Sequence, residues 1–309
     1  MDVAERRSTD EDASTSPGQR RGNSTLTERA RAKINLTLRI VGRRADGYHL
    51  LESFVAFADD LFDDLAFAPQ EALSLTVDGP MADDAGSVDD NLVLKAAREL
   101  AARCDKLALG AFHLTKRIPV AAGLGGGSAD AAAALRLLAR ANRIALDDGR
   151  LQSAARAVGA DVLVCLESRA RMMRGVGDEL DPPTTIALLP ALLVNPRVAC
   201  PTPNVFRAFA KRQQMSAIDL RNVLKIAAPD LNWFSAHAND LEASAIEIAP
   251  VISDILPALR ALPGCRLARM SGSGATCFGL FDNDEELRRA EHALRRSRPD
   301  WWIAATSIQ

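Results

Sequence analysis

Hydrophobic and polar residues alternate without a break from Lys33 to Ile40. Four aliphatic side chains share one face of this stretch, and the polar side chains Lys33, Asn35, Thr37 and Arg39 share the other. A period of two residues is the pattern of a β-strand. Lys33 and Asn35 therefore project the same way, about 7 Å apart by strand geometry. Taken alone, the pattern predicts a half-solvated strand with its polar face outward.

Strands and helices are predicted to alternate along the rest of the chain. Short apolar runs predict strands over 50–57, 73–77, 112–115, 186–194 and 277–281, and a final edge strand over 302–306. Helical spacing and capping residues predict helices over 91–103, 151–158, 239–248, 251–262 and 284–296, and two more that start near Ala129 and Thr202. The alternation predicts an α+β fold of two lobes, with an N-terminal domain over 26–182 and a C-terminal domain over 183–309.

Residues 1–25 differ in composition from everything that follows. They are rich in charged, Ser, Thr and Gly residues, and Val3 is their only large aliphatic residue. Such a segment buries too little apolar surface to offset the entropy lost on ordering. It also lacks the apolar region of a secretion signal. We therefore expect a disordered N-terminal extension.

The overall composition is typical of a globular protein with no unusual charge. The chain has 309 residues, of which 48% are hydrophobic and 25% charged, and its net charge is −2. This balance gives no electrostatic reason to bind nucleic acid, and no apolar run is long enough to cross a membrane. Five cysteines form no Cys-x-x-Cys pair, and four histidines lack metal-ligand spacing. We expect a cytoplasmic protein with reduced thiols and no structural zinc, and the oligomeric state stays open.

A glycine-rich loop stands out in the middle of the N-terminal half. Four glycines occur within the five positions 123–127, directly before Ser128 and an alanine-rich helical stretch. Glycines allow a tight turn and close approach of a ligand, and a helix N-terminus offers unpaired N–H groups to an anion. The P-loop pattern fails because Gly127 takes the place of its lysine, and Ser128 takes the third glycine position of the dinucleotide pattern. The loop alone fits either a different phosphate-binding loop or a plain turn.

Three other features carry groups suited to a ligand. The turn 42–47 leads into Tyr48, the only tyrosine, and His49, a pair that either binds a planar base or simply packs. Asp161 opens an apolar run, where an acid is usually an N-cap but can also accept a proton. A second loop of small residues spans 271–276. One such loop in each half predicts a ligand cleft between the lobes.

Together these motifs resemble the GHMP kinases, a family of small-molecule kinases. The family's Pro-x-x-x-Gly-Leu-Gly loop matches from Pro119 onward, and its opening Ala-Lys-Ile-Asn-Leu and Gly-x-Arg-x-Asp-Gly-Tyr-His patterns match at 32–36 and 42–49. Further matches are Asp-Asn-Leu at 90–92, Gly-Ala-Asp-Val at 159–162, Pro-Thr-Pro at 201–203 and the small-residue loop at 271–275. The similarity covers residues 28–309. It implies the two-lobed GHMP kinase fold, with the active site in the cleft between an N-terminal ATP-binding domain and a C-terminal domain.

Within the family, the opening pattern is most similar to members that act on a cytidine diphosphate-linked methylerythritol. The resemblance implies transfer of the ATP γ-phosphoryl group to the C2 hydroxyl of this small-molecule substrate, with Mg²⁺, on the non-mevalonate route to isoprenoids. It implies that Lys33 and Asp161 are the catalytic pair. It also implies ATP binding by Asn91, Pro119, Val120, Ala121, Ala122, Gly123, Leu124, Gly125, Gly126, Gly127, Ser128 and Ala129. Ser128 is the residue expected to contact Mg²⁺.

The resemblance also implies how the substrate is held. Tyr48 and Phe206 would stack on the two faces of cytosine, and His49 would hydrogen-bond its edge. Asn35 and Thr202 would lie along the erythritol and the diphosphate.

Two other functions fit parts of the sequence. The first is a GHMP kinase that acts on mevalonate or homoserine, although these acceptors offer no base to Tyr48. The second is a non-catalytic nucleotide-binding protein on the same scaffold, which the presence of both Lys33 and Asp161 disfavours.

Overall fold

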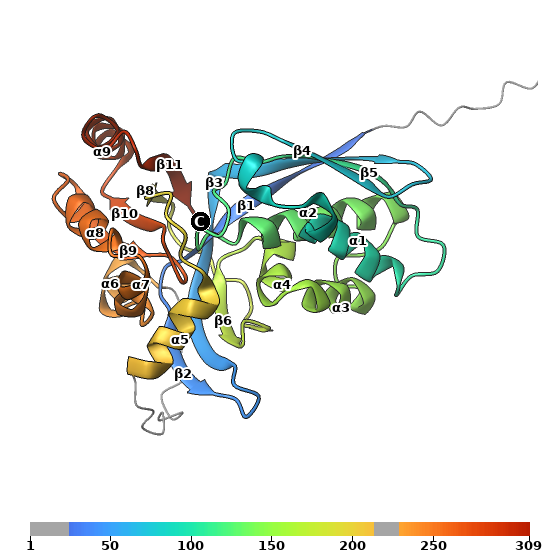
Figure 1. The fold of residues 1–309 in the computed structure, drawn as a ribbon, viewed down its shortest axis with the longest axis horizontal. Helices are drawn as coiled ribbons and strands as arrows, with labels where there is room; N and C mark the ends of the chain where they lie inside the picture. The colour runs from blue at the N-terminus through green and yellow to red at the C-terminus, as the bar shows by residue number, and fades with distance from the viewer. Residues whose placement is uncertain (1–24, 213–228) are drawn as a thin grey trace, which may run out of the picture.

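The computed structural model describes residues 25–212 and 229–309 and has two lobes on either side of one long strand (Figure 1). That strand is β3 (His49–Pro69), and it pairs with strands of both lobes. Its partners in the N-terminal lobe are β1 (Leu26–Asn35), β2 (Arg39–Arg43), β5 (Gly110–Thr115) and β6 (Arg171–Gly175). Alternate residues of β3 belong to different apolar clusters. Val55 and Phe57 belong to one cluster, and Phe54 and Ala56 belong to the other. The strand is therefore buried on both faces.

Four helices pack in the N-terminal lobe. They are α1 (Leu92–Ala101), α2 (Gly126–Asn142), α3 (Gly149–Val158) and α4 (Ala160–Glu167). Helix α2 contacts β1, α1 and α4, and its buried residues are mostly alanines, which let these neighbours approach closely. The lobe is completed by β4 (Ser74–Asp78), β7 (Glu179–Leu180) and the short turns η1 (Asp83–Ala85) and η2 (Val88–Asp90).

The C-terminal lobe is an antiparallel sheet with helices packed against it. Its strands are β8 (Leu189–Asn195), β9 (Cys265–Met270), β10 (Cys277–Phe281) and β11 (Trp302–Ile308). Its helices are α5 (Thr202–Arg212), α6 (Leu231–Ala236), α7 (Glu242–Ile248), α8 (Ile252–Arg260) and α9 (Asp284–Ser297). Helices α8 and α9 contact the sheet, and α5 packs on α7. The predicted α+β fold of two lobes is confirmed, whereas the predicted extension over 1–25 lies almost wholly outside the described residues.

The single strand predicted from Lys33 to Ile40 is two strands. β1 ends at Asn35 and β2 begins at Arg39. The prediction of a solvated polar face was wrong, because Lys33, Asn35 and Thr37 are only 2–3% exposed. The glycine loop and the opposite lobe cover this face: a Cβ on Gly125 would lie 3.1 Å from Cε of Lys33, and a Cβ on Gly272 would lie 3.2 Å from Oδ1 of Asn35. The alternation showed that the polar side chains share a face. That this face is interior followed only from the packing of other segments against it.

Strand β3 is far longer than the predicted strand over 50–57. The apolar pattern stops at Asp59, Asp60, Asp63 and Asp64, although the strand continues to Pro69. Three of these carboxylates bond to basic side chains from neighbouring segments, Asp59 to Arg31, Asp63 to Lys116, and Asp64 to Arg117. The partners lie far away in the sequence, so a pattern within one segment could not reveal them.

The strand predicted as an edge, 302–306, is in the middle of the sheet. β11 lies between β3 and β8, in the order β4-β5-β3-β11-β8-β10-β9. It pairs with β8 along its whole length and with β3 at Ile308. Its polar Thr306 is 4% exposed, and Oγ1 of Thr306 accepts from the backbone N–H of Asp60 at 3.2 Å. The polar residues of this strand suggested an edge, but a long-range hydrogen bond satisfies this one.

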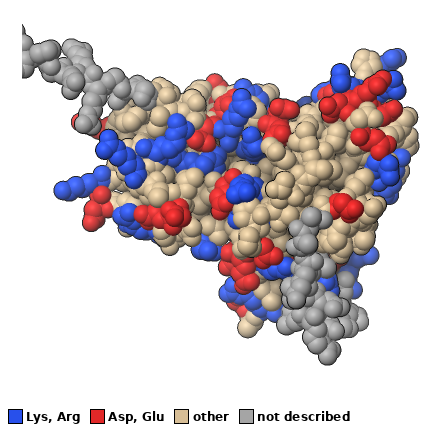
Figure 2. Space-filling view, turned by 180° about the vertical axis from the view of Figure 1, so that it is seen from behind, with Lys and Arg blue, Asp and Glu red and all other residues tan. Residues whose placement is uncertain are grey.

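The distribution of surface charge and the state of the cysteines fit the expectations drawn from the composition. Figure 2 shows acidic and basic side chains spread over both lobes on the face seen from behind. All five cysteines are free thiols, and four of them are buried. Among the described residues, no helix is long and apolar enough to cross a membrane.

Candidate active site

A cleft of about 1040 Å³ lies between the lobes and gathers most of the predicted site residues. Its walls include the glycine loop, the turn before β3, the start of α4 and the start of α5. The predicted residues that line it are Lys33, Asn35, Tyr48, His49, Asn91, Pro119, Val120, Ala121, Ala122, Gly123, Gly125, Gly126, Gly127, Ser128, Asp161, Thr202 and Phe206. Leu124 and Ala129 do not line it, because both side chains are 1% exposed and pack into the interior behind the loop.

The glycines of the loop are required by its close contacts. Gly123 has φ +77°, and a Cβ there would lie 2.5 Å from the carbonyl oxygen of Ser271 in the opposite lobe. Gly125 has φ +62°, and its Cβ would lie 3.1 Å from Cε of Lys33. A side chain at either position would clash or strain the backbone. The loop can therefore pass between the second lobe and Lys33 only as glycine.

Helix α2 begins directly after this loop and exposes its N-terminus to the cleft. Gly125 is the N-cap, and no side chain caps the helix. Ser128 is the third residue of the helix and lines the cleft, so its hydroxyl does not serve as the cap. A helix of 17 residues concentrates partial positive charge and unpaired N–H groups at this end. The local geometry is that of an anion site.

Hydrogen bonds from both lobes fix the loop in place. The Ser271 hydroxyl donates to the carbonyl oxygen of Gly123 at 2.9 Å, and the backbone N–H of Thr276 donates to that of Ala122 at 3.2 Å. On the other side, the backbone N–H of Lys33 donates to the carbonyl oxygen of Leu124 at 2.8 Å. The second small-residue loop thus supports the first; the sequence predicted a cleft between the two loops but not these contacts.

Lys33 and Asp161 form an ion pair beside the loop. Nζ of Lys33 is 3.2 Å from Oδ2 of Asp161, and the two side chains are 4% and 36% exposed. Asp161 is the second residue of α4 and the N-cap is Gly159, so the usual capping role does not apply. The ammonium is fixed in the interior while the carboxylate remains open to the cleft. This arrangement can neutralise negative charge and accept a proton at adjacent points.

Asn35 contacts Lys33 rather than only facing the cleft. Its Oδ1 accepts from Nζ of Lys33 at 3.0 Å, and its Nδ2 donates to Oγ of Ser53 at 2.7 Å. The Ser53 hydroxyl in turn donates to the carbonyl oxygen of Thr37 at 2.6 Å. The side chain of Asn35 is therefore committed to a buried chain of hydrogen bonds that holds the lysine. Sequence reasoning missed Ser53, which lies in another strand.

Aromatic rings form one end of the cleft. His49 stacks on Phe206 of α5, with ring centroids 5.3 Å apart and an interplanar angle of 27°. Nδ1 of His49 is buried without a hydrogen-bond partner, and burial followed by the charge of Arg43 lowers the pKa of the imidazole. Tyr48 is 66% exposed at the rim. A neutral imidazole with an unsatisfied nitrogen is suited to bind an uncharged polar ring.

Thr202 and Asn91 lie in different walls of the cleft. Oγ1 of Thr202 is 2.7 Å from Oγ of Ser273, so the start of α5 is joined to the second small-residue loop. Asn91 is the N-cap of α1, and its Oδ1 accepts from the backbone N–H of Val93 at 2.9 Å. That bond leaves the amide nitrogen of Asn91 available on the cleft side.

A buried charged cluster, which we call the triad, underlies the glycine loop. It consists of Lys116, Asp63 and Asp130, with side chains 0–4% exposed. Nζ of Lys116 donates to Oδ2 of Asp63 at 2.5 Å and to Oδ2 of Asp130 at 2.7 Å. Oδ1 of Asp63 also accepts the backbone N–H groups of Arg117 and Ile118. The triad therefore joins β3, the segment that enters the loop, and the helix that leaves it.

The two carboxylates of the triad are not equivalent. Asp63 accepts three hydrogen bonds, whereas Asp130 accepts one and its Oδ1 has no partner. Burial, together with the charge of Asp63, raises the pKa of Asp130 to about 8. The pKa of Lys116 is also raised, because the two carboxylates outweigh the effect of burial. Sequence analysis did not single out this cluster, although a lone acid inside an alanine-rich helix is an unusual residue.

The residues present fit a magnesium ion held mainly by a ligand's phosphates. Among the described residues, no three His, Cys, Asp or Glu side chains come together as a metal site. Mg²⁺ in kinase sites commonly needs only one or two protein oxygens beside phosphates and waters. Ser128 and Asp161 both present oxygens to the cleft.

Comparison with known proteins agrees with this geometry. Two family models match, the GHMP kinase N-terminal domain over residues 91–169 and the GHMP kinase C-terminal domain over residues 220–300. The 4-diphosphocytidyl-2-C-methyl-D-erythritol kinase of Rhodopseudomonas palustris (strain HaA2) is 54% identical over 294 residues, which cover 92% of this chain and 99% of the relative. The kinase of the same name from Methylorubrum extorquens is 54% identical over 290 residues, with the same coverage.

A solved structure is also similar over nearly the whole chain. A crystal structure of 4-(cytidine 5'-diphospho)-2C-methyl-D-erythritol kinase is 32% identical to this chain and superposes with a TM-score of 0.72. The match covers 92% of this chain and 99% of the crystallised one. The chain therefore belongs to the GHMP kinase family and, within it, to the 4-diphosphocytidyl-2-C-methyl-D-erythritol kinases.

Proposed function

We propose that this enzyme transfers the γ-phosphoryl group of ATP to the C2 hydroxyl of 4-diphosphocytidyl-2-C-methyl-D-erythritol, on the non-mevalonate route to isoprenoids. The observation that carries the proposal is the juxtaposition in one cleft of an uncapped helix N-terminus, the Lys33–Asp161 pair and an aromatic end with His49. The helix N-terminus suits phosphates, the Lys33–Asp161 pair suits an alcohol that must lose a proton, and the aromatic end suits a base. The high identity to relatives of this activity supports the same assignment.

Asp161 and Lys33 divide the chemistry between them. An alcohol with a pKa far above neutral must release its proton as the phosphoryl group arrives, and Asp161 is the acceptor. Lys33 lies 3.2 Å from that carboxylate and neutralises charge beside it and at the transferring group. Most of the rate comes from positioning and electrostatic stabilisation, as in phosphoryl transfer generally.

The loop from Pro119 to Ala129 and Asn91 form the ATP site in this proposal. The backbone N–H groups at the start of α2 bind the phosphates, while Leu124 and Ala129 support the loop from behind. Ser128 would contact Mg²⁺, which would supply positive charge to the phosphate oxygens when bound. The N-terminal domain over 26–182 would hold most of this site, and the C-terminal domain over 183–309 would complete it.

The aromatic end holds the cytosine. Tyr48 and Phe206 stack on its faces, His49 bonds its edge, and Asn35 and Thr202 lie toward the erythritol and diphosphate. Stacking of a base on an aromatic side chain is worth about 1–3 kcal/mol by analogy with nucleic-acid binding. The aromatic residues and Thr202 therefore contribute to affinity and selectivity rather than to the chemical step, whereas Asn35 also holds Lys33.

An acceptor panel tests the proposal. ADP release by the full chain is measured with ATP, Mg²⁺ and one acceptor at a time: the cytidyl methylerythritol, free methylerythritol phosphate without the cytidyl group, mevalonate or homoserine. We expect turnover with the cytidyl acceptor alone. Equal turnover of mevalonate or homoserine would favour another GHMP kinase activity. ATP binding without turnover of any acceptor would favour a non-catalytic protein.

A further inference from the structure

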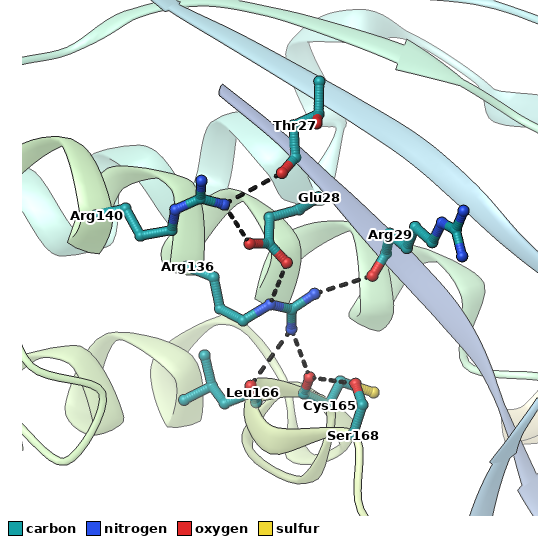
Figure 3. Close-up of polar contacts among 8 residues, drawn as sticks. All are labelled: Thr27, Glu28, Arg29, Arg136, Arg140, Cys165, Leu166 and Ser168. Atoms are coloured by element: carbon teal, nitrogen blue, oxygen red, sulfur yellow. Dashed lines mark hydrogen bonds and ion pairs between the residues drawn. The ribbon is translucent and has the colours of Figure 1, made fainter. Parts of the chain in front are cut away.

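Arg136 lies at the back of the N-terminal lobe, away from the cleft, and makes hydrogen bonds to two other elements. It is a residue of α2, and its side chain is 12% exposed. Figure 3 shows its guanidinium between the strand β1 and the end of the helix α4. The Nε donates to Oε2 of Glu28 at 3.0 Å and the Nη2 to the carbonyl oxygen of Arg29 at 3.0 Å. The Nη1 donates to the carbonyl oxygens of Cys165 and Leu166 at 2.8 and 3.4 Å.

Each of the three elements that meet at Arg136 carries part of the active site at its other end. Helix α2 begins at the glycine loop, ten residues or about 15 Å of helix before Arg136. Strand β1 carries Lys33, four residues or about 13 Å of strand beyond Arg29. Helix α4 carries Asp161, four residues or about 6 Å of helix before Cys165. One side chain thus joins the elements that carry the phosphate loop, the lysine and the carboxylate.

Apolar packing against α2 and α3 holds helix α4, and hydrogen bonds at its C-terminal end add to that packing. It has eight residues, too few for a stable isolated helix, and no side chain caps its N-terminus. The carbonyl oxygens of Cys165 and Leu166 are among the last four, which have no partner within the helix. Arg136 binds both, and the Ser168 hydroxyl also donates to that of Cys165 at 2.9 Å. A cation at a helix C-terminus is also favoured by the helix dipole.

The shape of arginine matters for this contact. Acceptors on β1 and α4 lie on different sides of the guanidinium, and its planar fork of five N–H groups reaches all of them at once. A lysine ammonium is a point donor on a flexible stem and cannot span the same acceptors.

We propose that Arg136 is a positioning residue for catalysis, which sets the place of Asp161 relative to Lys33 and the glycine loop. This inference rests on the proposed function, since it assigns Arg136 to the same reaction. Arg136 does not touch the substrates. It acts by holding helix α4, which carries Asp161, in position. A shift of about 1 Å in a reacting group can cost about 100-fold in rate.

Arg140 provides a matched control in the same helix. It lies one turn further along α2, donates to Oε1 of Glu28 at 2.7 Å and to the carbonyl oxygen of Thr27 at 3.2 Å, and is 51% exposed. Both of its bonds are to β1. Arg136→Gln and Arg140→Gln therefore remove the same charge from neighbouring turns, and the first also removes the bonds to α4.

The test compares these two variants with Arg136→Lys. We expect Arg136→Gln to lower kcat about 30- to 100-fold with the KM for ATP changed less than about 3-fold. Arg136→Lys should recover little of this loss, and Arg140→Gln should keep kcat within about 2-fold of the parent. Amide hydrogen exchange of residues 160–167 should become faster in Arg136→Gln and not in Arg140→Gln. A parental kcat in Arg136→Gln, or equal losses in both glutamine variants, would overturn the proposal.

A double-mutant cycle separates positioning from general damage. If Arg136 acts through Asp161, adding Arg136→Gln to Asp161→Asn should lower the residual rate by less than about 3-fold, because the group being positioned is already disabled. The same loss in both backgrounds would contradict the assignment. If Arg136→Gln does not fold, Arg136→Lys replaces it in the same cycle, because it keeps the charge but cannot span the acceptors on β1 and α4.

The failure of this inference differs from the failure of the proposed function. A parental enzyme that turns over the cytidyl acceptor, with an equally active Arg136→Gln, contradicts the inference alone. If the parental enzyme prefers another acceptor, the proposed function fails and the same variants are compared with that acceptor. The hydrogen-exchange measurement requires no turnover at all.

Discussion

Two lysine–aspartate groups flank the glycine loop, and they differ chiefly in their access to solvent. In the pair Lys33–Asp161, the carboxylate is 36% exposed to the cleft. In the triad around Lys116, all three side chains are 0–4% exposed. The first group has an open carboxylate that can exchange a proton with a bound alcohol. The second group is almost inaccessible to water although Lys116 and Asp130 border the cleft, and its charged groups are bonded to each other and to the backbone.

The same residue types are therefore proposed to serve chemistry in one place and structure in another. A buried charge is costly unless it is paired, and breaking a buried pair leaves that cost uncompensated. An exposed pair contributes little to stability because water screens it. We therefore expect a substitution of Asp161, the open member of the first pair, to remove activity and leave the fold intact. Substitutions in the triad should lower stability first.

Asp161→Asn should have the strongest effect on activity. The variant keeps the size and polarity of the side chain but removes the proton acceptor, so kcat should fall about 10³-fold. The midpoint of chemical unfolding should stay close to that of the parent, because the lost pair is partly exposed. Steady-state kinetics and urea unfolding measure the two quantities. A variant with parental kcat would show that Asp161 orients the acceptor and is not its base.

Lys116→Met should have the strongest effect on stability. The substitution leaves the Asp63 carboxylate and the Asp130 carboxyl group buried without their ammonium partner, and we expect the free energy of unfolding to fall by about 3–5 kcal/mol. The matched control is Arg117→Met, the next residue, whose ion pair with Asp64 is about half exposed. This control should lose no more than about 1 kcal/mol. Similar losses in the two variants would remove the distinction between buried and open charge.

The pH dependence of stability separates the two carboxylates of the triad. The folded chain keeps the Asp130 proton until its pKa of about 8, whereas the unfolded chain releases it near 3.8. Between these values the unfolded state binds fewer protons, so this residue makes the free energy of unfolding fall as pH rises. Above about pH 8 Asp130 is ionised in both states and no longer makes the free energy of unfolding change with pH.

Asp130→Asn should remove this fall. Urea unfolding from about pH 5 to about pH 9 should give a flatter profile for the variant than for the parent, and kcat near pH 7 should stay within about 3-fold because the replaced group is already uncharged there. His49 and other groups outside the triad contribute equally to both proteins, so the difference between the profiles reports Asp130 together with its interaction with Lys116 and Asp63. Parallel profiles would mean that Asp130 is ionised in the folded protein.

Ser53→Ala should have the weakest effect, and it tests the support of the open pair. The loss of this hydroxyl leaves the Asn35 amide without its partner, and Lys33 is then held less firmly. We expect kcat to fall about 3- to 10-fold, equivalent to the roughly 1 kcal/mol of one hydrogen bond. The KM for ATP should not change. A change in the KM for the cytidyl acceptor with constant kcat would mean that Asn35 acts on the substrate alone and does not support Lys33.

Local sequence predicted those parts of the site that lie within one segment. Glycine spacing and the following helical stretch identified the loop, and the i, i+2 spacing placed Lys33 and Asn35 on one face. The same reasoning failed at β3 beyond Phe57 and at β11, where polar residues suggested a strand end and an edge. In both cases the polar groups bond to residues far along the chain, such as Asp63 to Lys116 and Asp60 to Thr306.

The amino-acid sequence alone was enough to identify the family, and through that resemblance it predicted a phosphate-binding loop and the joint action of Lys33 and Asp161, because these are carried by short motifs with strict residue requirements. Which charges are buried followed only from the packing of the elements. Lys116, Asp63 and Asp130 come from three segments, and Arg136 meets β1 and α4 only after α2 has packed between them. Burial is a property of all the elements that surround a residue, so no pattern within one segment can fix it.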